Sequence, residues 1–173
     1  AARATVPGPL AGLLLAARGS LRLDRLEARI GEGVADQRGG AAGVETEALL
    51  ERGGALLRLA ASAEGEALRA LGLPTRTRAA LAAAAGGDLF FASGRVRVAP
   101  ALRAERVGEH AGLSAKLGAS VRVVGPLLLR ASAGRTFRAP SISELYLRQG
   151  TVDPNPDLRS EVGAGADASL VLD

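Results

Sequence analysis

Apolar and polar side chains alternate with a period of two along most of this chain. The pattern is clearest at residues 127–134, where leucines and alanines at odd positions alternate with mixed or polar residues. This is the period of a β-strand, because successive side chains of a strand point to opposite faces of the sheet. The alternation fails from Thr136 and resumes at Glu161. The sequence therefore predicts two strands joined by a long irregular segment.

The same alternation predicts about nine strands in the whole chain. They are expected near residues 13–24, 26–34, 44–51, 57–63, 75–85, 95–105, 116–123, 127–135 and 161–172. Short turns are predicted near residues 24, 53, 87 and 125, and longer loops near 39, 70, 109 and 148. Pro100 predicts a bulge or a strand end. Short turns on one rim and longer loops on the other are typical of an outer-membrane barrel.

Helix is the competing interpretation for residues 44–52 and 64–71, which are rich in good helix formers. Gly53 and Gly54 lie between these two stretches, and the alternation continues on both sides of the pair. A hairpin is therefore favoured.

The two-residue period also predicts which side chains share a face. One face should carry Leu21, Leu23, Leu117, Val121, Leu127, Leu129, Leu170 and Leu172. The opposite face should carry Arg22, Lys116, Arg122, Arg130 and Asp167.

Composition excludes several classes of protein. Apolar residues make up 47% of the 173 residues but only 2% are aromatic, which leaves little bulk to fill a compact interior. No apolar run approaches the roughly 18 residues of a membrane helix, so a membrane protein of this sequence must be a barrel. The net charge of +4 comes without interleaved aromatic residues to stack bases, which argues against nucleic acid as a partner.

No catalytic or metal-binding constellation is present in the sequence. There is no cysteine, and the single His110 is expected in a polar, solvent-exposed loop at residues 107–112. One imidazole cannot form a metal site unaided. The acidic residues are scattered singly along the predicted strands. We therefore expect no enzyme, no cofactor and no metal.

A specific signature covers the predicted irregular segment. The strand that ends near Arg135 is followed by a set of short motifs. These are GRTFRAPS at residues 134–141, ELY at 144–146, NPDL at 155–158 and Glu161. This order of elements resembles the mid-barrel signature of TonB-dependent outer-membrane receptors; Ser160 departs from it, where that family usually has proline. The matching positions that we expect to be structural are Arg135, Phe137, Arg138, Pro140, Glu144, Leu145, Tyr146, Asn155, Pro156, Leu158 and Glu161.

The resemblance implies an all-β fold, an antiparallel up-and-down transmembrane β-barrel segment that is part of a larger barrel. Transporters of this kind close 22 strands around a plugged lumen, so residues 1–173 are expected to be a partial barrel domain without the plug domain and the C-terminus of the barrel. The scarcity of tryptophan and tyrosine departs from the aromatic girdles usual in such barrels.

The resemblance also implies a function: energised uptake of a bulky, scarce ligand, such as a ferric siderophore or cobalamin, across the outer membrane of a Gram-negative bacterium. The implied partners are outer-membrane lipid, the plug domain of the same parent chain, the TonB energy-transducing complex and a small-molecule chelate. Two alternatives stay open: a passive porin-like or structural barrel segment, and a soluble β-sheet binding module.

Within the irregular segment, residues 137–146 are expected to anchor it to the inner wall, with Arg138 and Glu144 close enough to pair after a turn. Residues 147–157 form the tip, which is more suited to ligand. The candidate ligand contacts are Arg148, Gln149, Asp153 and Asn155.

Overall fold

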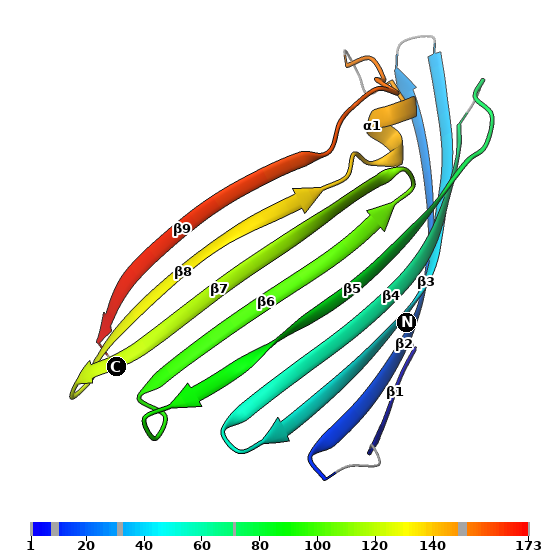
Figure 1. Cartoon of the computed structure of the whole chain (residues 1–173). Coiled ribbons are helices and arrows are strands. Elements are labelled where there is room, and N and C mark those ends of the chain that lie inside the picture. Colours follow the sequence, from blue (N-terminus) through cyan, green and yellow to red (C-terminus); the bar gives the residue numbers. More distant parts are fainter. Residues whose placement is uncertain (1, 8–10, 31–32, 71, 149–151, 173) are drawn as a thin grey trace.

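The described part of the chain forms one curved antiparallel sheet and one short helix (Figure 1). The computed structural model describes residues 2–7, 11–30, 33–70, 72–148 and 152–172. The elements are β1 (Ala2–Pro7), β2 (Leu13–Ile30), β3 (Gly33–Arg52), β4 (Ala55–Ala70), β5 (Arg76–Phe91), β6 (Val96–Val107), β7 (His110–Val124), β8 (Leu127–Arg138), α1 (Ile142–Tyr146) and β9 (Glu161–Leu172). Among the described residues, no helix is both long and apolar enough to cross a membrane.

The strands follow one another across the sheet in chain order, each antiparallel to the next. This confirms the predicted all-β, up-and-down fold. Residues 44–52 and 64–70 are strand, joined by a turn at Gly53 and Gly54, so the hairpin interpretation is also confirmed. The predicted count of about nine strands agrees with the structure, but the strands differ. Residues 26–30 of the strand predicted at 26–34 belong to β2, and β1 was not predicted.

The connections lie on two rims. The ends of β1 and β2, β3 and β4, β5 and β6, and β7 and β8 that follow each other in the chain meet at one rim, which we call the turn rim. The consecutive ends of β2 and β3, β4 and β5, β6 and β7, and β8 and β9 meet at the opposite rim, which we call the loop rim. The turns near 53 and 125 and the loops near 70 and 148 are where they were predicted. The connection near 109 is a two-residue turn.

The predicted turn near residue 24 and the predicted glycine-rich loop at 37–43 are wrong. β2 continues through this point to Ile30, and residues 37–43 lie inside β3, paired with both neighbouring strands. A Cβ atom at Gly40 would lie 3.2 Å from Cδ2 of Leu23. The glycines therefore allow close approach of neighbouring strands instead of ending them.

The predicted turn at residues 86–88 is also wrong. These residues belong to β5, and the chain turns at Ala92 and Ser93, which have φ of +51° and +54° and are closed by a hydrogen bond from Gly94 N to Phe91 O of 3.1 Å. Pro100 does not end β6. The ladder between β5 and β6 is interrupted beside it, where proline has no N–H to donate, while the pairing of Pro100 with Leu117 is intact.

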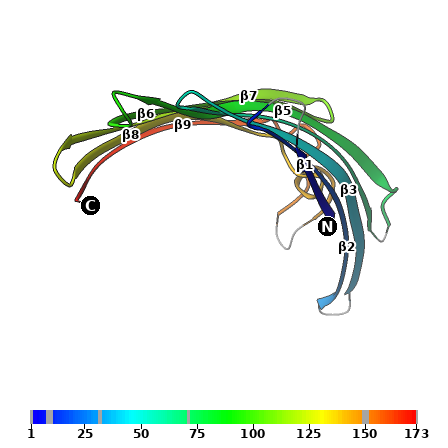
Figure 2. The same ribbon diagram turned by 90° about the horizontal axis from the view of Figure 1, so that it is seen from below.

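The two faces of the sheet separate as the alternation predicts. Cross-strand partners point to the same face, and the register places all eight predicted apolar residues on one side and all five predicted charged residues on the other. Figure 2 shows the sheet as an arch, with the helix under it. Because α1 packs on the face that carries Leu68, the charged face is concave and the apolar face is convex.

The convex face is exposed and apolar, with Leu23 at 78% and Leu172 at 79% exposure. Buried side chains are few among the described residues. Apart from Ala41, they are Leu68 of β4 and four residues in and next to α1, of which Ile142 and Leu147 pack with Leu68; the four are Pro140, Ile142, Leu145 and Leu147. The small core of this fold is therefore the contact between one loop and the concave face.

Candidate functional site

The segment between β8 and β9, residues 139–160, folds inward over the concave face, and we call it the inward loop (Figures 1 and 2). It leaves the sheet at β8, yet its helix α1 contacts β4 and β5. It therefore crosses the concave side of the strands between them. Residues 149–151 of the loop lie outside the described residues.

The local sequence explains why α1 forms. Ser141 is the N-cap, and its hydroxyl accepts a hydrogen bond from the backbone N–H of Glu144, while the Glu144 carboxylate accepts one from the N–H of Ser141 at 2.7 Å. This capping box satisfies two N–H groups that the start of a helix leaves without partners. Pro140, immediately before it, is fully buried.

Apolar contacts fix the helix to the inner wall. Leu68 of β4 packs with Ile142 and Leu147, and all three are buried. The guanidinium of Arg76 lies 4.4 Å from the centre of the Tyr146 ring, a cation–π contact. The predicted anchoring segment thus meets partners on β4 and β5.

Arg78 makes a second, polar attachment. Its guanidinium pairs with Glu66 on the adjacent strand and donates a hydrogen bond to the backbone oxygen of Pro140. The Arg78 side chain is 14% exposed, so this pair is better shielded from water than the pairs that Arg58, Arg97 and Arg103 make. Sequence analysis missed Glu66, Leu68, Arg76 and Arg78, since nothing near them in the sequence indicates a loop from β8 as their partner.

Arg138 and Glu144 pair as predicted from their spacing. The Arg138 guanidinium donates to both carboxylate oxygens of Glu144, at 2.8 and 2.9 Å, and also contacts Glu161 at 3.2 Å. The pair joins the end of β8, α1 and the start of β9. It is not shielded from solvent, because the Arg138 side chain is 51% exposed.

These contacts predict an acid-sensitive loop. The hydrogen bond from Arg138, with those from Ser141, lowers the pKa of Glu144 from 4.5 to about 2. Because the pKa of Glu144 is lower in the folded loop than in the unfolded chain, its charge stabilises the folded loop at pH values above about 4.5. This stabilisation is lost as the pH falls from about 4.5 through about 2. The protection of the backbone amides of residues 141–147, measured relative to the intrinsic exchange rate at each pH, should fall over that interval. Glu144→Gln should exchange faster at neutral pH and show a flatter pH dependence; identical profiles would contradict the role of the pair.

Phe137 covers a glycine on the neighbouring strand. A Cβ atom at Gly112 would lie 2.0 Å from Cδ2 of the Phe137 ring, and the Phe137 N–H donates to Ser114 Oγ at 3.0 Å. We expect Gly112→Ala to displace the ring and destabilise the fold by about 1–3 kcal/mol, as overpacking does. Urea unfolding checks this. Adding Phe137→Ala should make Gly112→Ala nearly harmless, and a purely additive double variant would refute the contact.

Asn155, Leu158 and Arg135 of the signature also make hydrogen bonds. The N–H of Asn155 donates to Glu144 O at 3.2 Å, and Asn155 Oδ1 accepts from the N–H of Asp157 at 3.0 Å, which closes a turn around Pro156. Leu158 N donates to Asn155 O at 3.2 Å. Arg135 lies on the convex side by register and donates to Leu113 O at 2.6 Å.

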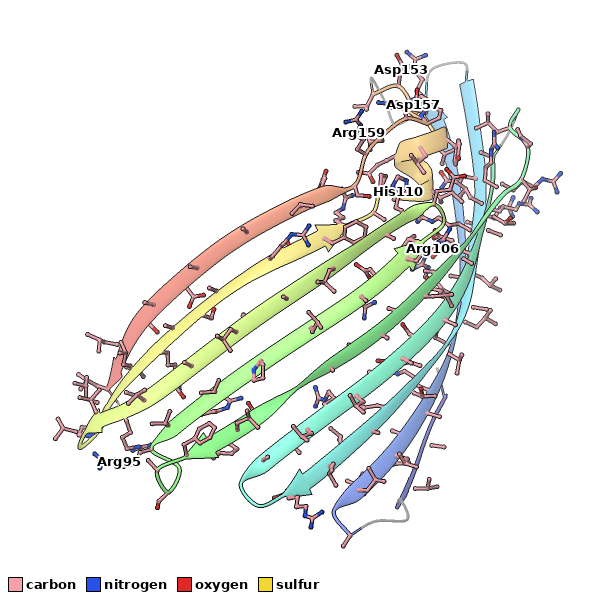
Figure 3. The ribbon with its side chains drawn as sticks, in the orientation of Figure 1. Arg95, Arg106, His110, Asp153, Asp157 and Arg159 are labelled. Atoms are coloured by element: carbon pink, nitrogen blue, oxygen red, sulfur yellow. The ribbon has the colours of Figure 1, made fainter. Side chains whose placement is uncertain are left out.

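The tip of the inward loop is exposed and charged. Arg148 and Asp153 form an ion pair of 3.1 Å with side chains 70% and 75% exposed. Figure 3 shows Asp153, Asp157 and Arg159 together beyond the helix at the loop rim. Of the candidate ligand contacts, Gln149 lies outside the described residues, and Asn155 is engaged in the turn. A ligand role for the four residues stays a prediction.

His110 is not in a solvent-exposed loop, which corrects the expectation. It is the first residue of β7 and partly buried, and its Nδ1 lies 3.0 Å from Ser160 Oγ. This contact ties the end of the inward loop to the turn between β6 and β7. Among the described residues, no group of three or more metal-binding side chains gathers.

The concave wall below the loop carries charges of both signs. Ion pairs join strand side chains there: Arg22 with Asp24, Arg58 with Glu47, Arg97 with Asp88 and Arg103 with Glu105. A polar groove of about 440 Å³ runs across β2 to β6, with Arg18, Glu45 and Glu64 in its lining. A hydrated or polar body, and not lipid, suits this face.

Comparison with known proteins gives a family and a fold. Residues 58–173 match the family described as TonB dependent receptor-like, beta-barrel. The copper transporter OprC superposes with a TM-score of 0.74 at 14% identity, over 97% of this chain and 34% of its own. The siderophore receptor PirA from Pseudomonas aeruginosa superposes with a TM-score of 0.69 at 13% identity, over 94% of this chain and 39% of its own. The unliganded ferric citrate transporter FecA superposes with a TM-score of 0.57 at 12% identity, over 75% of this chain and 26% of its own. No curated protein sequence matches the chain.

Proposed function

Since this chain belongs to the TonB-dependent receptor-like β-barrel family, we propose that it is a wall segment of an outer-membrane receptor that takes up a bulky, scarce ligand. It spans about a third of the length of the solved structures OprC and PirA. Residues 1–173 would then be a partial barrel domain that acts together with further strands and a plug domain of the same protein.

The observation that carries the proposal is the pairing of an apolar convex face with a charged concave face that holds an inward loop. The convex face matches lipid. The concave face offers paired charges and a polar groove toward the lumen. Irregular backbone at membrane depth is tolerated where protein or water satisfies it, and the capping box and Arg78 do this for the inward loop.

A metal chelate is the ligand class that we propose, in agreement with the copper, siderophore and ferric citrate proteins of similar fold. The proposed partners are outer-membrane lipid, the plug domain, and the TonB complex that supplies energy. The test compares a Gram-negative strain with and without the gene. Uptake is measured for radioactive iron as ferric citrate, for radioactive iron as a ferric siderophore, and for cyanocobalamin. Without the gene, uptake of one of these three ligands should fall. Equal uptake with and without TonB would instead indicate a passive pore.

The inward loop allows its anchoring and capturing parts to be separated. In the intact receptor, Arg138→Ala should lower the folded yield, because it removes the contacts to both Glu144 and Glu161. Arg148→Ala should weaken ligand binding about tenfold at normal yield, because its exposed pair with Asp153 contributes little to stability. Yield after membrane extraction and equilibrium binding check both.

The matched control for charge is Arg95→Ala at the turn rim, away from the inward loop (Figure 3). This variant should change neither the folded yield nor ligand binding. If Arg138→Ala weakened binding at normal yield and Arg148→Ala lowered the yield, the assignment of the two parts would be reversed.

A further inference from the structure

A band of large apolar side chains runs along the concave face at the turn rim. Six strands each contribute one residue near the strand end, and we call this set the inner collar: Leu14, Leu49, Leu56, Phe90, Leu128 and Val171. The register places all six on the face that carries Leu68. Leu14 is 49% exposed and Phe90 is 45% exposed. The inner collar is therefore an exposed apolar surface on the inside of the arch seen in Figure 2.

The inner collar is continuous over the four strands from β2 to β5. Leu14 and Leu49 are directly opposed. By register, Leu56 lies diagonally across from Leu49 on one side and from Phe90 on the other, which is within reach of large side chains. Strands β6 and β7 carry arginines at this height. The remaining two members are directly opposed on β8 and β9 and continue the band there.

The wall between the inner collar and the inward loop is different in kind. In the middle of the sheet, the concave positions of β2 to β9 carry only alanine, glycine, serine or charged residues. They are the even positions of 16–24, 58–64, 80–86, 114–120 and 130–134 and the odd positions of 41–47, 99–105 and 163–169. Charged side chains favour contact with water, whereas large apolar side chains favour a dry contact. The pattern therefore indicates a partner that touches this face at the turn rim.

The height of the band and the charges next to it select the occupant. Successive concave residues of a strand are two positions apart, roughly 7 Å, so the band is too low to hold an acyl chain along the strands. A second copy nested under the arch would place its apolar convex face against the charged wall, which costs desolvation. A folded domain of the same polypeptide fits better. This chain spans 34% of OprC and 39% of PirA, so a protein of that length has ample chain to supply such a domain.

We propose that the inner collar packs against an apolar ring on the plug domain and closes the lumen at the turn rim to water and small solutes. The inference rests on the proposed function, which supplies the plug domain, and adds where on this wall the dry contact lies. Between the inner collar and the inward loop, the small and charged side chains keep the space between plug and wall hydrated. A polar ligand can then lie along the middle of the wall while the seal at the turn rim is closed.

Passive ionic current tests the seal without ligand and without TonB. The full-length protein carrying this sequence is reconstituted in planar lipid bilayers, and the current is measured per folded protein. Leu56→Ser combined with Phe90→Ser should raise the current at least about tenfold, because losing two buried apolar side chains shifts the equilibrium toward an open seal. The matched control is Leu57→Ser combined with Phe91→Ser, on the convex face of the same two strands. The control should leave the current unchanged, and equal currents in the two double variants would overturn the proposal.

Photo-crosslinking tests the contact with the rest of the inner collar intact. A benzophenone amino acid in place of Phe90 should join the wall to the plug domain of the same polypeptide, which mass spectrometry of the digested protein identifies. In place of Phe91, on the convex face, it should join lipid. In place of Ala84, in the middle of the concave wall, it should give little crosslink to protein, because water separates the two surfaces there.

The outcomes separate this inference from the proposed function. Joining to lipid or to a second copy at position 90, or equal joining to the plug domain at positions 84 and 90, would overturn the inner collar as the dry contact. Crosslinking and sealing as expected in a protein without TonB-dependent uptake would support the inner collar and refute the proposed function. Uptake that depends on TonB, with no crosslink at position 90, would do the reverse.

Discussion

Replacing Leu68 by alanine should detach the inward loop while the nine strands stay paired. Leu68 is 6% exposed and holds Ile142 and Leu147 against β4. Truncating a buried leucine to alanine costs about 2–5 kcal/mol, which would raise the opening equilibrium of the loop about thirtyfold to several thousandfold. Amide exchange of residues 141–147 measures this opening directly.

The matched control is Leu14→Ala. Leu14 shares the concave face by register but is 49% exposed and lies near the turn rim. It should leave the exchange of residues 141–147 unchanged. If Leu68→Ala left that exchange unchanged too, the apolar cluster would not be what anchors the loop.

Replacing Gly87 by alanine should prevent β4 and β5 from pairing as they do. A Cβ atom there would lie 2.3 Å from the backbone oxygen of Leu56 and 3.2 Å from Cα of Leu57. Backbone atoms of a central strand cannot move aside as a side chain can, so we expect a loss of about 3 kcal/mol or more, at the upper end of overpacking. Folded yield and the midpoint of guanidinium unfolding check this.

Gly65→Ala is the matched control, since it lies on β4 in the same strand pair and has nothing within 4 Å of the added Cβ. It should be neutral or slightly stabilising, because alanine restricts the unfolded chain. Equal midpoints for the two variants would show that the approach of the strands at Gly87 is not tight.

The alternation alone predicted the faces of the sheet, because a period of two is a property of each strand and needs no knowledge of its neighbours. Glycine misled the prediction of turns. At residues 37–43 and 86–87 it permits close approach between strands, whereas the turn at Ala92 and Ser93 uses positive φ without glycine at either residue. Composition cannot distinguish these two uses.

The candidate site was predictable where it is local. Arg138 and Glu144 are six positions apart, and the capping box can be read from Ser141 and Glu144. The docking of the loop was not predictable, since Arg78 and Pro140 are 62 positions apart and meet only because the sheet curves.

Because of that separation, the inward loop can dock only after much of the sheet has assembled. The loop begins after β8, but the residue that its apolar side chains contact lies on β4. Helix α1 can therefore dock only once the strands between β4 and β8 are paired and bent. Contacts of such long sequence separation form late, because the chain entropy of closing them must be overcome first. A wall that has not curled would leave Ile142 and Leu147 exposed to solvent. Docking of α1 therefore requires that the strands from β4 to β8 are already paired and curved.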